Sequence, residues 1–252
     1  MSLAFDLNGR TALITGGAAG IGRAICDMLA NSGASIVVLD YNSVAVDKTV
    51  SELRQRGHHS IGVHVDLADS QDITKMLNDL SQRGVDVDIL VLCASAELRE
   101  PWHSVTGPAM ETQWATNLSA SVQLVRDLVP SMQARGFGRV IAVGSVQEIR
   151  PRDDCLIYAA TKAAQTHMML NWARHAVQPG ITFNVLRPGA IATDRNRAVL
   201  ADPAYRQAVL AKIPLARIGQ PTDCAGVVAL LCSEHASYIN GAVIDVDGGM
   251  RL

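Results

Sequence analysis

The sequence RTALITGGAAGIG, residues 10–22, decides the fold of this 252-residue chain. Residues 10–15 have three apolar side chains at their centre, Ala12, Leu13 and Ile14, and predict a short buried strand. A strand followed by a glycine turn and a helix is the context in which a loop binds the phosphates of a dinucleotide. The helix is indicated by apolar residues at three- and four-residue steps, namely Ile21, Ile25, Met28 and Leu29.

The three spaced glycines of this turn have separate tasks. Gly16 allows the tight turn, Gly20 lets the backbone approach a pyrophosphate, and Gly22 lets the helix pack closely on the strand. The free N–H groups at the start of the helix then face the phosphates. The spacing is Gly-x3-Gly-x-Gly rather than Gly-x-Gly-x2-Gly, and a glycine-rich turn without a ligand is the alternative.

Asp40 follows the second apolar run, residues 35–39. An acidic residue at the carboxyl tip of this strand can accept hydrogen bonds from the adenosine ribose and would repel a 2′-phosphate. No Arg or Lys stands at positions 17–19 or 41–46 to offset that repulsion. The sequence therefore predicts NAD(H) rather than NADP(H) as the cofactor, with a simple turn residue at Asp40 as the alternative.

Further apolar runs separated by helical patterns define the rest of the fold. Alternating strands and helices predict a parallel sheet with right-handed crossovers. We therefore expect residues 1–252 to form a single-domain, Rossmann-like, three-layer α/β fold, with a seven-stranded parallel sheet and helices on both faces. The expected strands lie near residues 10–15, 35–40, 60–65, 87–93, 138–144, 181–187 and 242–246.

Composition excludes several classes of protein. A net charge of −2 gives no electrostatic reason to expect nucleic acid or an anionic membrane as a partner. The apolar runs are far shorter than the ~20 residues of a membrane span, and the start of the chain does not resemble a secretory signal. Five scattered cysteines without metal spacing predict no metal site and fit a reducing, cytoplasmic compartment.

Tyr158 and Lys162 are four residues apart and would share one face of a helix. A neighbouring ammonium favours the phenolate, so it should lower the pKa of the phenol from an ordinary value near ~10. The hydroxyl of Ser145, thirteen residues upstream, could hold a substrate oxygen beside the phenol. This trio indicates a proton-transfer site, although a Tyr and a Lys on an ordinary helix surface would show the same spacing.

Together these motifs resemble the short-chain dehydrogenase/reductase family over essentially the whole chain. Each motif is weak by itself, whereas the ordered set at these spacings is highly specific. The matching residues are Thr15, Gly16, Gly20, Gly22, Asp40, Asp66, Leu67, Asn117, Ser145, Tyr158, Lys162, Pro188, Gly189, Thr193, Asp247, Gly248 and Gly249.

The resemblance implies a catalytic tetrad of Asn117, Ser145, Tyr158 and Lys162. It also implies that Asn117 holds a water linking Lys162 to solvent, and that residues 188–193 surround the nicotinamide. The cofactor-binding residues that it implies are Gly16, Ala19, Gly20, Ile21, Gly22, Asp40, Asp66, Leu67, Ala94, Tyr158, Lys162, Pro188, Gly189, Ile191 and Thr193.

One family motif is replaced in this chain. Members usually carry Asn-Asn-Ala-Gly after the fourth strand, where residues 92–95 read Leu-Cys-Ala-Ser. Ala94 is retained, and Ser95 takes the place of the glycine. Since the family motif lies beside the cofactor ribose and stabilises the sheet, its replacement bears on cofactor affinity and local stability rather than on hydride transfer.

We expect an NAD(H)-dependent oxidoreductase that interconverts a small-molecule secondary alcohol and a ketone. Polar residues after the fourth and fifth strands favour a polyol, a sugar or a hydroxy acid, unless they are polar only because loops face water. The alternatives are an NADP(H)-linked reductase of carrier-bound 3-oxoacyl groups and a protein that binds a dinucleotide without turning it over.

Two further expectations concern the lid and the assembly. The resemblance implies that residues 193–213 form a mobile lid over the substrate, with a helix starting at Asp202-Pro203, whereas a plain pair of surface helices is the alternative. Helices near 117–134 and 157–177 carry more apolar residues than one buried face needs. With the resemblance, this excess predicts a homotetramer with two-fold interfaces.

Overall fold

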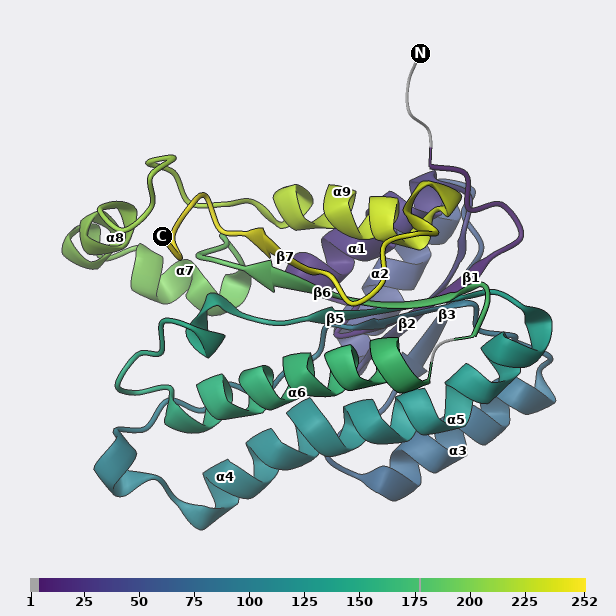
Figure 1. Ribbon diagram of the computed structural model, residues 1–252, viewed down its shortest axis with the longest axis horizontal. Helices are drawn as coiled ribbons and strands as arrows, with labels where there is room; N and C mark the ends of the chain where they lie inside the picture. The colour runs from purple at the N-terminus through teal and green to yellow at the C-terminus, as the bar shows by residue number, and fades with distance from the viewer. Residues whose placement is uncertain (1–4, 177) are drawn as a thin grey trace.

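The computed structural model describes residues 5–176 and 178–252. These residues form a seven-stranded, all-parallel sheet in the order β3-β2-β1-β4-β5-β6-β7. Helices cover both faces of the sheet, so the fold is a single Rossmann-like domain of three layers (Figure 1). The fold class predicted from the sequence is confirmed.

Every expected strand is present and begins and ends within two residues of its expected bounds. The buried runs are mostly apolar because both faces of a parallel sheet are covered by helices. The strands are β1 Thr11–Thr15, β2 Ser35–Asp40, β3 Ser60–His64, β4 Ile89–Leu92, β5 Gly138–Val143, β6 Ile181–Pro188 and β7 Val243–Val246.

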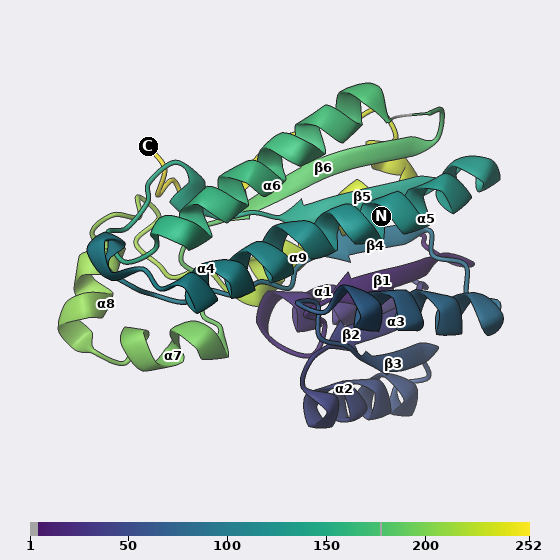
Figure 2. The same cartoon turned by 90° about the horizontal axis from the view of Figure 1, so that it is seen from below.

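Two sets of helices pack on opposite faces of the sheet. In Figure 1, α1 (Gly20–Asn31), α2 (Ser43–Gln55) and α9 (Pro221–Cys232) lie above the sheet. The other set lies below it and faces the viewer in Figure 2. That second set comprises α3 Ser70–Gln82, α4 Gly107–Trp114, α5 Ala120–Arg135 and α6 Leu156–His175.

Successive side chains of β1 show how the two layers are filled. Ala12 and Ile14 are buried in the cluster formed with α1 and α9, whereas Leu13 is buried in the cluster formed with α3 and α5. This division follows from the two-residue period of a strand. The sheet is therefore anchored on both faces, and its strand ends provide a rigid edge on which loops can place functional groups.

The remaining helices stand beyond the carboxyl ends of the strands. Figure 2 shows α7 (Asp194–Leu200) and α8 (Pro203–Leu210) at that end of the sheet, together with the C-terminus. The predicted helix start is confirmed, because the Asp202 side chain accepts a hydrogen bond from the Ala204 N–H at 3.0 Å. Strand order changes direction at β1, which lies between β2 and β4, and open α/β sheets bind ligands at such a point.

Among the helices of the described residues, none is both long and apolar enough to cross a membrane.

Candidate active site

An open cleft lies over the carboxyl ends of the strands and gathers most of the residues that the sequence singled out. It runs from the glycine turn, past the ends of β2, β4, β5 and β6, to α7 and α8. Asn117 lies behind this surface and is fully buried. The predicted residues that line the cleft are Gly16, Ala19, Gly20, Ile21, Gly22, Asp40, Asp66, Leu67, Ala94, Ser145, Tyr158, Lys162, Pro188, Gly189, Ile191 and Thr193.

The glycine turn is shaped to bring backbone close to a ligand. Gly16 has a φ of 66°, and a Cβ added there would lie 3.0 Å from the Cα of Ala94. A Cβ on Gly22 would collide with the Gly16 carbonyl. Helix α1 begins with Ala19 as its N-cap, which offers no side-chain acceptor to the first N–H groups of the helix. These donors face the cleft and fit the phosphates of a dinucleotide.

Asp40 ties the end of β2 to this turn. Its 9% exposed side chain accepts hydrogen bonds from the N–H of Ala18 at 3.3 Å and from the N–H of Asn42 at 3.2 Å. The carboxylate therefore has a structural task in the turn in addition to facing the cleft. A test of its role in cofactor choice must separate its charge from these hydrogen bonds.

Thr15 supplies hydrogen bonds at the replaced family motif. Its hydroxyl oxygen accepts from the N–H groups of Cys93 at 2.9 Å and Ala94 at 3.0 Å, and donates to the carbonyl of Val91 at 3.2 Å. Thr15 is buried, so these bonds join the ends of β1 and β4 away from water. The strand end is held even though the two asparagines of the family motif are replaced.

Ser145 is fixed by the buried carboxylate of Glu148, which belongs to the polar segment after β5. The Ser145 N–H donates to Glu148 Oε1 at 2.8 Å, and the Thr166 hydroxyl on α6 donates to Glu148 Oε2 at 2.9 Å. Burial raises the pKa of Glu148, whereas these hydrogen bonds and Arg187 lower it. The carboxylate fits because Gly144 has no Cβ, which would collide with it.

Tyr158 and Lys162 lie on one face of α6, as predicted. The predicted lowering of the Tyr158 pKa, however, is wrong for the protein without a bound cofactor. Burial raises the pKa of Tyr158 to about 12, although Arg195 and the Ser145 hydroxyl act to lower it. Burial also lowers the pKa of Lys162 from 10.5 to about 8. In both side chains, removal from water outweighs the stabilisation of charge by neighbours.

The Asn117 side chain joins the loop after β4 to α6 through hydrogen bonds. Its side-chain amide donates to the Ala96 carbonyl at 3.0 Å and to the Thr161 hydroxyl at 2.9 Å. Its Oδ1 accepts from the Ala96 N–H at 2.8 Å. Asn117 sits in a π-helical turn, residues 115–119, between α4 and α5, and such insertions often mark functional sites.

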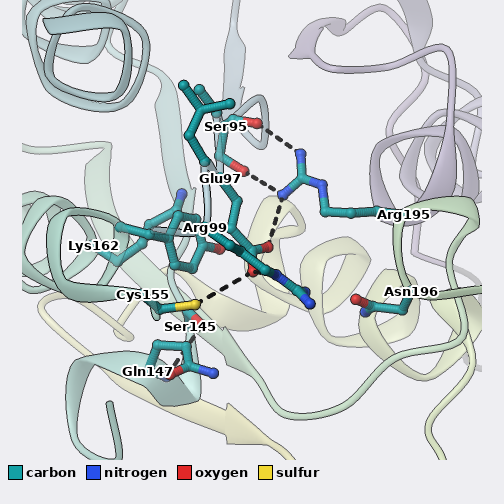
Figure 3. A network of polar contacts seen from close by, with 12 residues as sticks. Ser95, Glu97, Arg99, Ser145, Gln147, Cys155, Lys162, Arg195 and Asn196 are labelled. Carbon is teal, nitrogen blue, oxygen red and sulfur yellow. Dashed lines mark hydrogen bonds and ion pairs between the residues drawn. The ribbon is translucent and has the colours of Figure 1, made fainter. Parts of the chain in front are cut away.

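A network of charged groups lines the cleft (Figure 3), and the sequence indicated its polar residues after the fourth strand but not their contacts with Arg195. Arg195 on α7 donates to the Ser95 hydroxyl at 3.1 Å and to the Ser95 carbonyl at 2.7 Å. Glu97 lies 3.6 Å from Arg195 and 2.8 Å from the Nε of Arg99, and it accepts from the Cys155 thiol at 3.6 Å. Ser95 thus connects α7 to the loop after β4.

No three His, Cys, Asp or Glu side chains within residues 5–176 and 178–252 come together in a way that could hold a metal ion.

Comparisons with known proteins agree with this geometry. The sequence model of a family described as Enoyl-(Acyl carrier protein) reductase matches residues 16–251. The 7alpha-hydroxysteroid dehydrogenase of Escherichia coli is 31% identical, over 96% of this chain and 94% of its own length. The chain belongs to the short-chain dehydrogenase/reductase family. It is accordingly an oxidoreductase of hydroxyl or ketone substrates that binds a nicotinamide dinucleotide.

Two solved structures are similar over almost the entire chain. A 3-oxoacyl (acyl-carrier-protein) reductase from Agrobacterium tumefaciens with NADP bound is 33% identical, covers 99% of this chain and 98% of its own, and has a TM-score of 0.93. A gluconate 5-dehydrogenase from Burkholderia cenocepacia in complex with NADP and tartrate is 30% identical, covers 98% and 97%, and has a TM-score of 0.93. These two relatives differ in substrate, so family membership alone does not identify the substrate of this protein.

Proposed function

We propose that this protein uses NAD(H) to interconvert a secondary alcohol and a ketone on a polar substrate such as a polyol, a sugar or a hydroxy acid. The observation that carries the proposal is the meeting of Ser145, Tyr158 and Lys162 in the cleft that also contains the glycine turn. A phenol, a hydroxyl and an ammonium at this place form a proton-transfer apparatus beside a dinucleotide site.

Each side chain has one task in alcohol oxidation. Bound NAD(+) would accept the hydride from the carbinol carbon. Tyr158, as phenolate, takes the hydroxyl proton. The Ser145 oxygen accepts from the Gln147 N–H at 3.2 Å, so its own hydrogen, which stabilises the Tyr158 oxygen here, can be donated to a substrate oxygen bound between them. Lys162 supplies positive charge that favours the phenolate, and ketone reduction uses the same groups in reverse.

The charged wall of the cleft favours a hydroxy acid among these substrates. Glu97, Arg99 and Arg152 line the same cleft as Tyr158. Arg99 bonds Glu97 through Nε, and Figure 3 shows the end of its guanidinium pointing away from Glu97 toward Asn196. A guanidinium end of this kind can bind a carboxylate in two-point fashion. The bound tartrate of the gluconate 5-dehydrogenase also supports this choice.

The function is tested with a substrate panel followed at the absorbance of the reduced nicotinamide. The panel contains polyols, aldonates, neutral secondary alcohols and 3-hydroxyacyl esters, each offered with NAD and with NADP. We expect turnover of aldonates or polyols with NAD. A protein that binds NADH but reduces no NAD with any alcohol would instead be a non-catalytic dinucleotide-binding protein.

The second candidate is an NADP(H)-linked reductase of carrier-bound 3-oxoacyl groups. The similarity to the 3-oxoacyl reductase that holds NADP favours it. The polar cleft wall and Asp40 argue against it, because an acyl chain needs apolar lining and a 2′-phosphate needs a cation. Preferred turnover of 3-hydroxyacyl esters with NADP would select this candidate.

Asp40 should favour NAD(H) over NADP(H) by at least tenfold in kcat/KM. Two unit charges about 4 Å apart repel by about 4 kcal/mol at an effective dielectric constant of about 20. A third of that energy already corresponds to about tenfold. Replacing Asp40 with Ala and Tyr41 with Arg should narrow or reverse the preference, since the pair of changes removes the repulsion and supplies a phosphate partner.

Asp40→Asn is the matched control for this experiment. It removes the charge and keeps one acceptor oxygen, which can serve the N–H of Ala18 or that of Asn42 but not both. We expect the NAD to NADP ratio to fall while kcat/KM with NAD stays near that of the native protein. If both cofactors weaken together and the ratio is unchanged, Asp40 acts only in the turn.

Residues 193–213 are proposed to be a lid over the substrate. Arg195 at the start of this segment bonds Ser95 on the opposite side of the cleft, and Tyr205 on α8 accepts from Arg152 at 3.3 Å. Both contacts are polar and exchangeable, whereas Val209 and Ile213 near the end of the segment pack with Ile218 in an apolar cluster. We expect NADH and substrate to slow proteolysis within 193–213, and no protection would contradict this role.

The protein is proposed to be a homotetramer. Val122 on α5 and Leu170 on α6 are 40% and 37% exposed, and Trp114 on α4 is 50% exposed. The edge strand β7 pairs only with β6 within the described sheet. Apolar helix faces and an open edge strand are surfaces that partners usually cover. Light scattering at micromolar concentration should give four times the chain mass, and a monomer would contradict the proposal.

A further inference from the structure

A chain of buried polar groups runs behind Tyr158, on the inner side of Lys162. The Lys162 ammonium donates to the Val143 carbonyl at 2.7 Å and to Gln165 Oε1 at 3.1 Å. The Gln165 amide nitrogen donates to the Ser121 hydroxyl at 2.9 Å and to the Asn117 carbonyl at 3.3 Å. None of these side chains is more than 3% exposed.

The Asn117 carbonyl is the inner end of this chain. It accepts from Gln165 and also from the Ser121 hydroxyl at 3.0 Å. The carbonyl lies in the π-helical turn, where the Ala120 N–H donates to the carbonyl of Ala115, five residues back. The family resemblance implied a water on Asn117 that links Lys162 to solvent. In this chain the side chain of Gln165 bonds both the Lys162 ammonium and the Asn117 carbonyl, and so bridges them directly.

The amide of Gln165 can have only one orientation in this position. Its oxygen faces an ammonium, which has hydrogens to donate, and its nitrogen faces a carbonyl and a hydroxyl oxygen. The flipped amide would place N–H groups against the ammonium and oxygen against the carbonyl. Unlike a water or a hydroxyl, an amide nitrogen does not exchange its proton readily along a hydrogen-bonded chain. This side chain therefore holds Lys162 without offering a path for protons.

We propose that Gln165 is a positioning residue for proton transfer, which holds the Lys162 ammonium toward the cleft and closes its inner side to solvent. The proton that Tyr158 takes from the substrate then leaves through the open cleft rather than past Asn117. This inference rests on the proposed alcohol oxidation for its kinetic consequences, whereas the contact of Gln165 with Lys162 can be tested without catalysis.

The charge state of Lys162 depends on its few neighbours. Burial lowers the pKa of Lys162 to about 8, Arg195 on α7 lowers it further, and the Glu148 carboxylate opposes both by favouring the ammonium. Tyr158 lies one turn earlier on the same helix. Because the ammonium is only marginally favoured at neutral pH, loss of the Gln165 acceptor should shift Lys162 toward the neutral form. A neutral Lys162 no longer favours the Tyr158 phenolate.

Two substitutions distinguish positioning from space filling. Gln165→Met keeps the length of the side chain and removes its hydrogen bonds, so kcat for oxidation at pH 7 should fall at least tenfold. Gln165→Ala leaves a polar space that a water can enter and use to accept from Lys162, so it should retain more activity than Met. The acid limb of the kcat/KM profile should move to higher pH in the Met variant. A side chain that merely fills space would give the opposite order, with Met better than Ala.

Thermal unfolding measured against pH reports on Lys162 without catalysis. A buried lysine with a lowered pKa destabilises the fold below that pKa, so native stability should rise as pH passes upward through about 8. In Gln165→Met this rise should begin at lower pH, since Lys162 loses an acceptor. Gln133→Met, which removes a bond to the Ala176 carbonyl at the far end of α5, should change neither the pH profile nor the activity.

The proposed function and the inference about Gln165 can be contradicted by different results. If no alcohol is oxidised by any variant, the proposed function fails while the unfolding profiles still test the contact. If the Met and native proteins share the same unfolding profile, and Met is at least as active as Ala, the inference about Gln165 is overturned.

Discussion

Replacing Tyr158 with Phe should lower turnover by at least ~10²-fold, and a loss of ~10⁴-fold lies within the usual range for a general acid–base. The substitution keeps the ring, which is buried at the start of α6, and removes only the hydroxyl. Because this hydroxyl transfers the proton and also contacts the substrate oxygen, no neighbouring group can replace it. Steady-state rates with the preferred alcohol provide the measurement.

The same variant should bind NADH as tightly as the native protein. The glycine turn and Asp40 are in other elements, and their contacts do not involve the Tyr158 hydroxyl. Fluorescence titration with NADH separates loss of chemistry from loss of cofactor binding. Tyr238→Phe removes the same group at a fully exposed position and should leave the rate unchanged. Turnover near the native level in Tyr158→Phe would exclude the mechanism.

Patterns that are local in the sequence predicted the frame of this protein well. The glycine turn, the apolar runs and the i, i+4 pair of Tyr158 and Lys162 depend on residues close together in the chain. The number and bounds of the strands followed from these patterns, because each buried strand needs an apolar run of its own. The same reasoning placed Asp40 at the edge of the cleft.

Contacts between distant segments could not be predicted in this way. Glu148 was one charge in a polar loop, and only the fold shows it buried against Ser145 and Thr166. Gln165 was an unremarked residue of a helix until the π-helical turn brought the Asn117 carbonyl to it. The sign of the Tyr158 pKa change was also wrong, because the spacing of residues does not reveal burial, which raises this pKa more than Arg195 and the Ser145 hydroxyl lower it.

Replacing Lys162 with Met should abolish most of the activity. It should also remove the unfavourable free energy of burying the Lys162 charge on folding. Lys162 is 1% exposed, and burial lowers its pKa from 10.5 to about 8. Loss of the ammonium removes the positive charge that favours the Tyr158 phenolate, and we expect turnover to fall at least ~10²-fold. NADH binding should also weaken, since Lys162 lines the cofactor cleft.

The effect on stability should depend on pH in a defined direction. Below about pH 8 the lysine is protonated in both the folded and the unfolded chain, so folding must bury a full charge. Between about 8 and 10.5 the folded chain loses its proton first, and this destabilisation fades. The free energy of unfolding of the Met variant, relative to that of the native protein, should therefore be highest below pH 8. This relative stability should decrease as the pH rises to 10.5.

Unfolding of both proteins across pH 6–11 gives the required comparison. Each pH unit between the two pKa values is worth ~1.4 kcal/mol, so the pH-dependent part of the difference should approach ~3 kcal/mol. Using only the pH-dependent part avoids the fixed cost of leaving the Val143 carbonyl and Gln165 without their donor. Lys75→Met, at an exposed position on α3, controls for loss of a positive charge in general. If the difference in unfolding free energy between the two proteins stays constant from pH 6 to 11, burial does not destabilise the charged form of Lys162. The account of proton transfer that depends on a lowered Lys162 pKa would then be wrong.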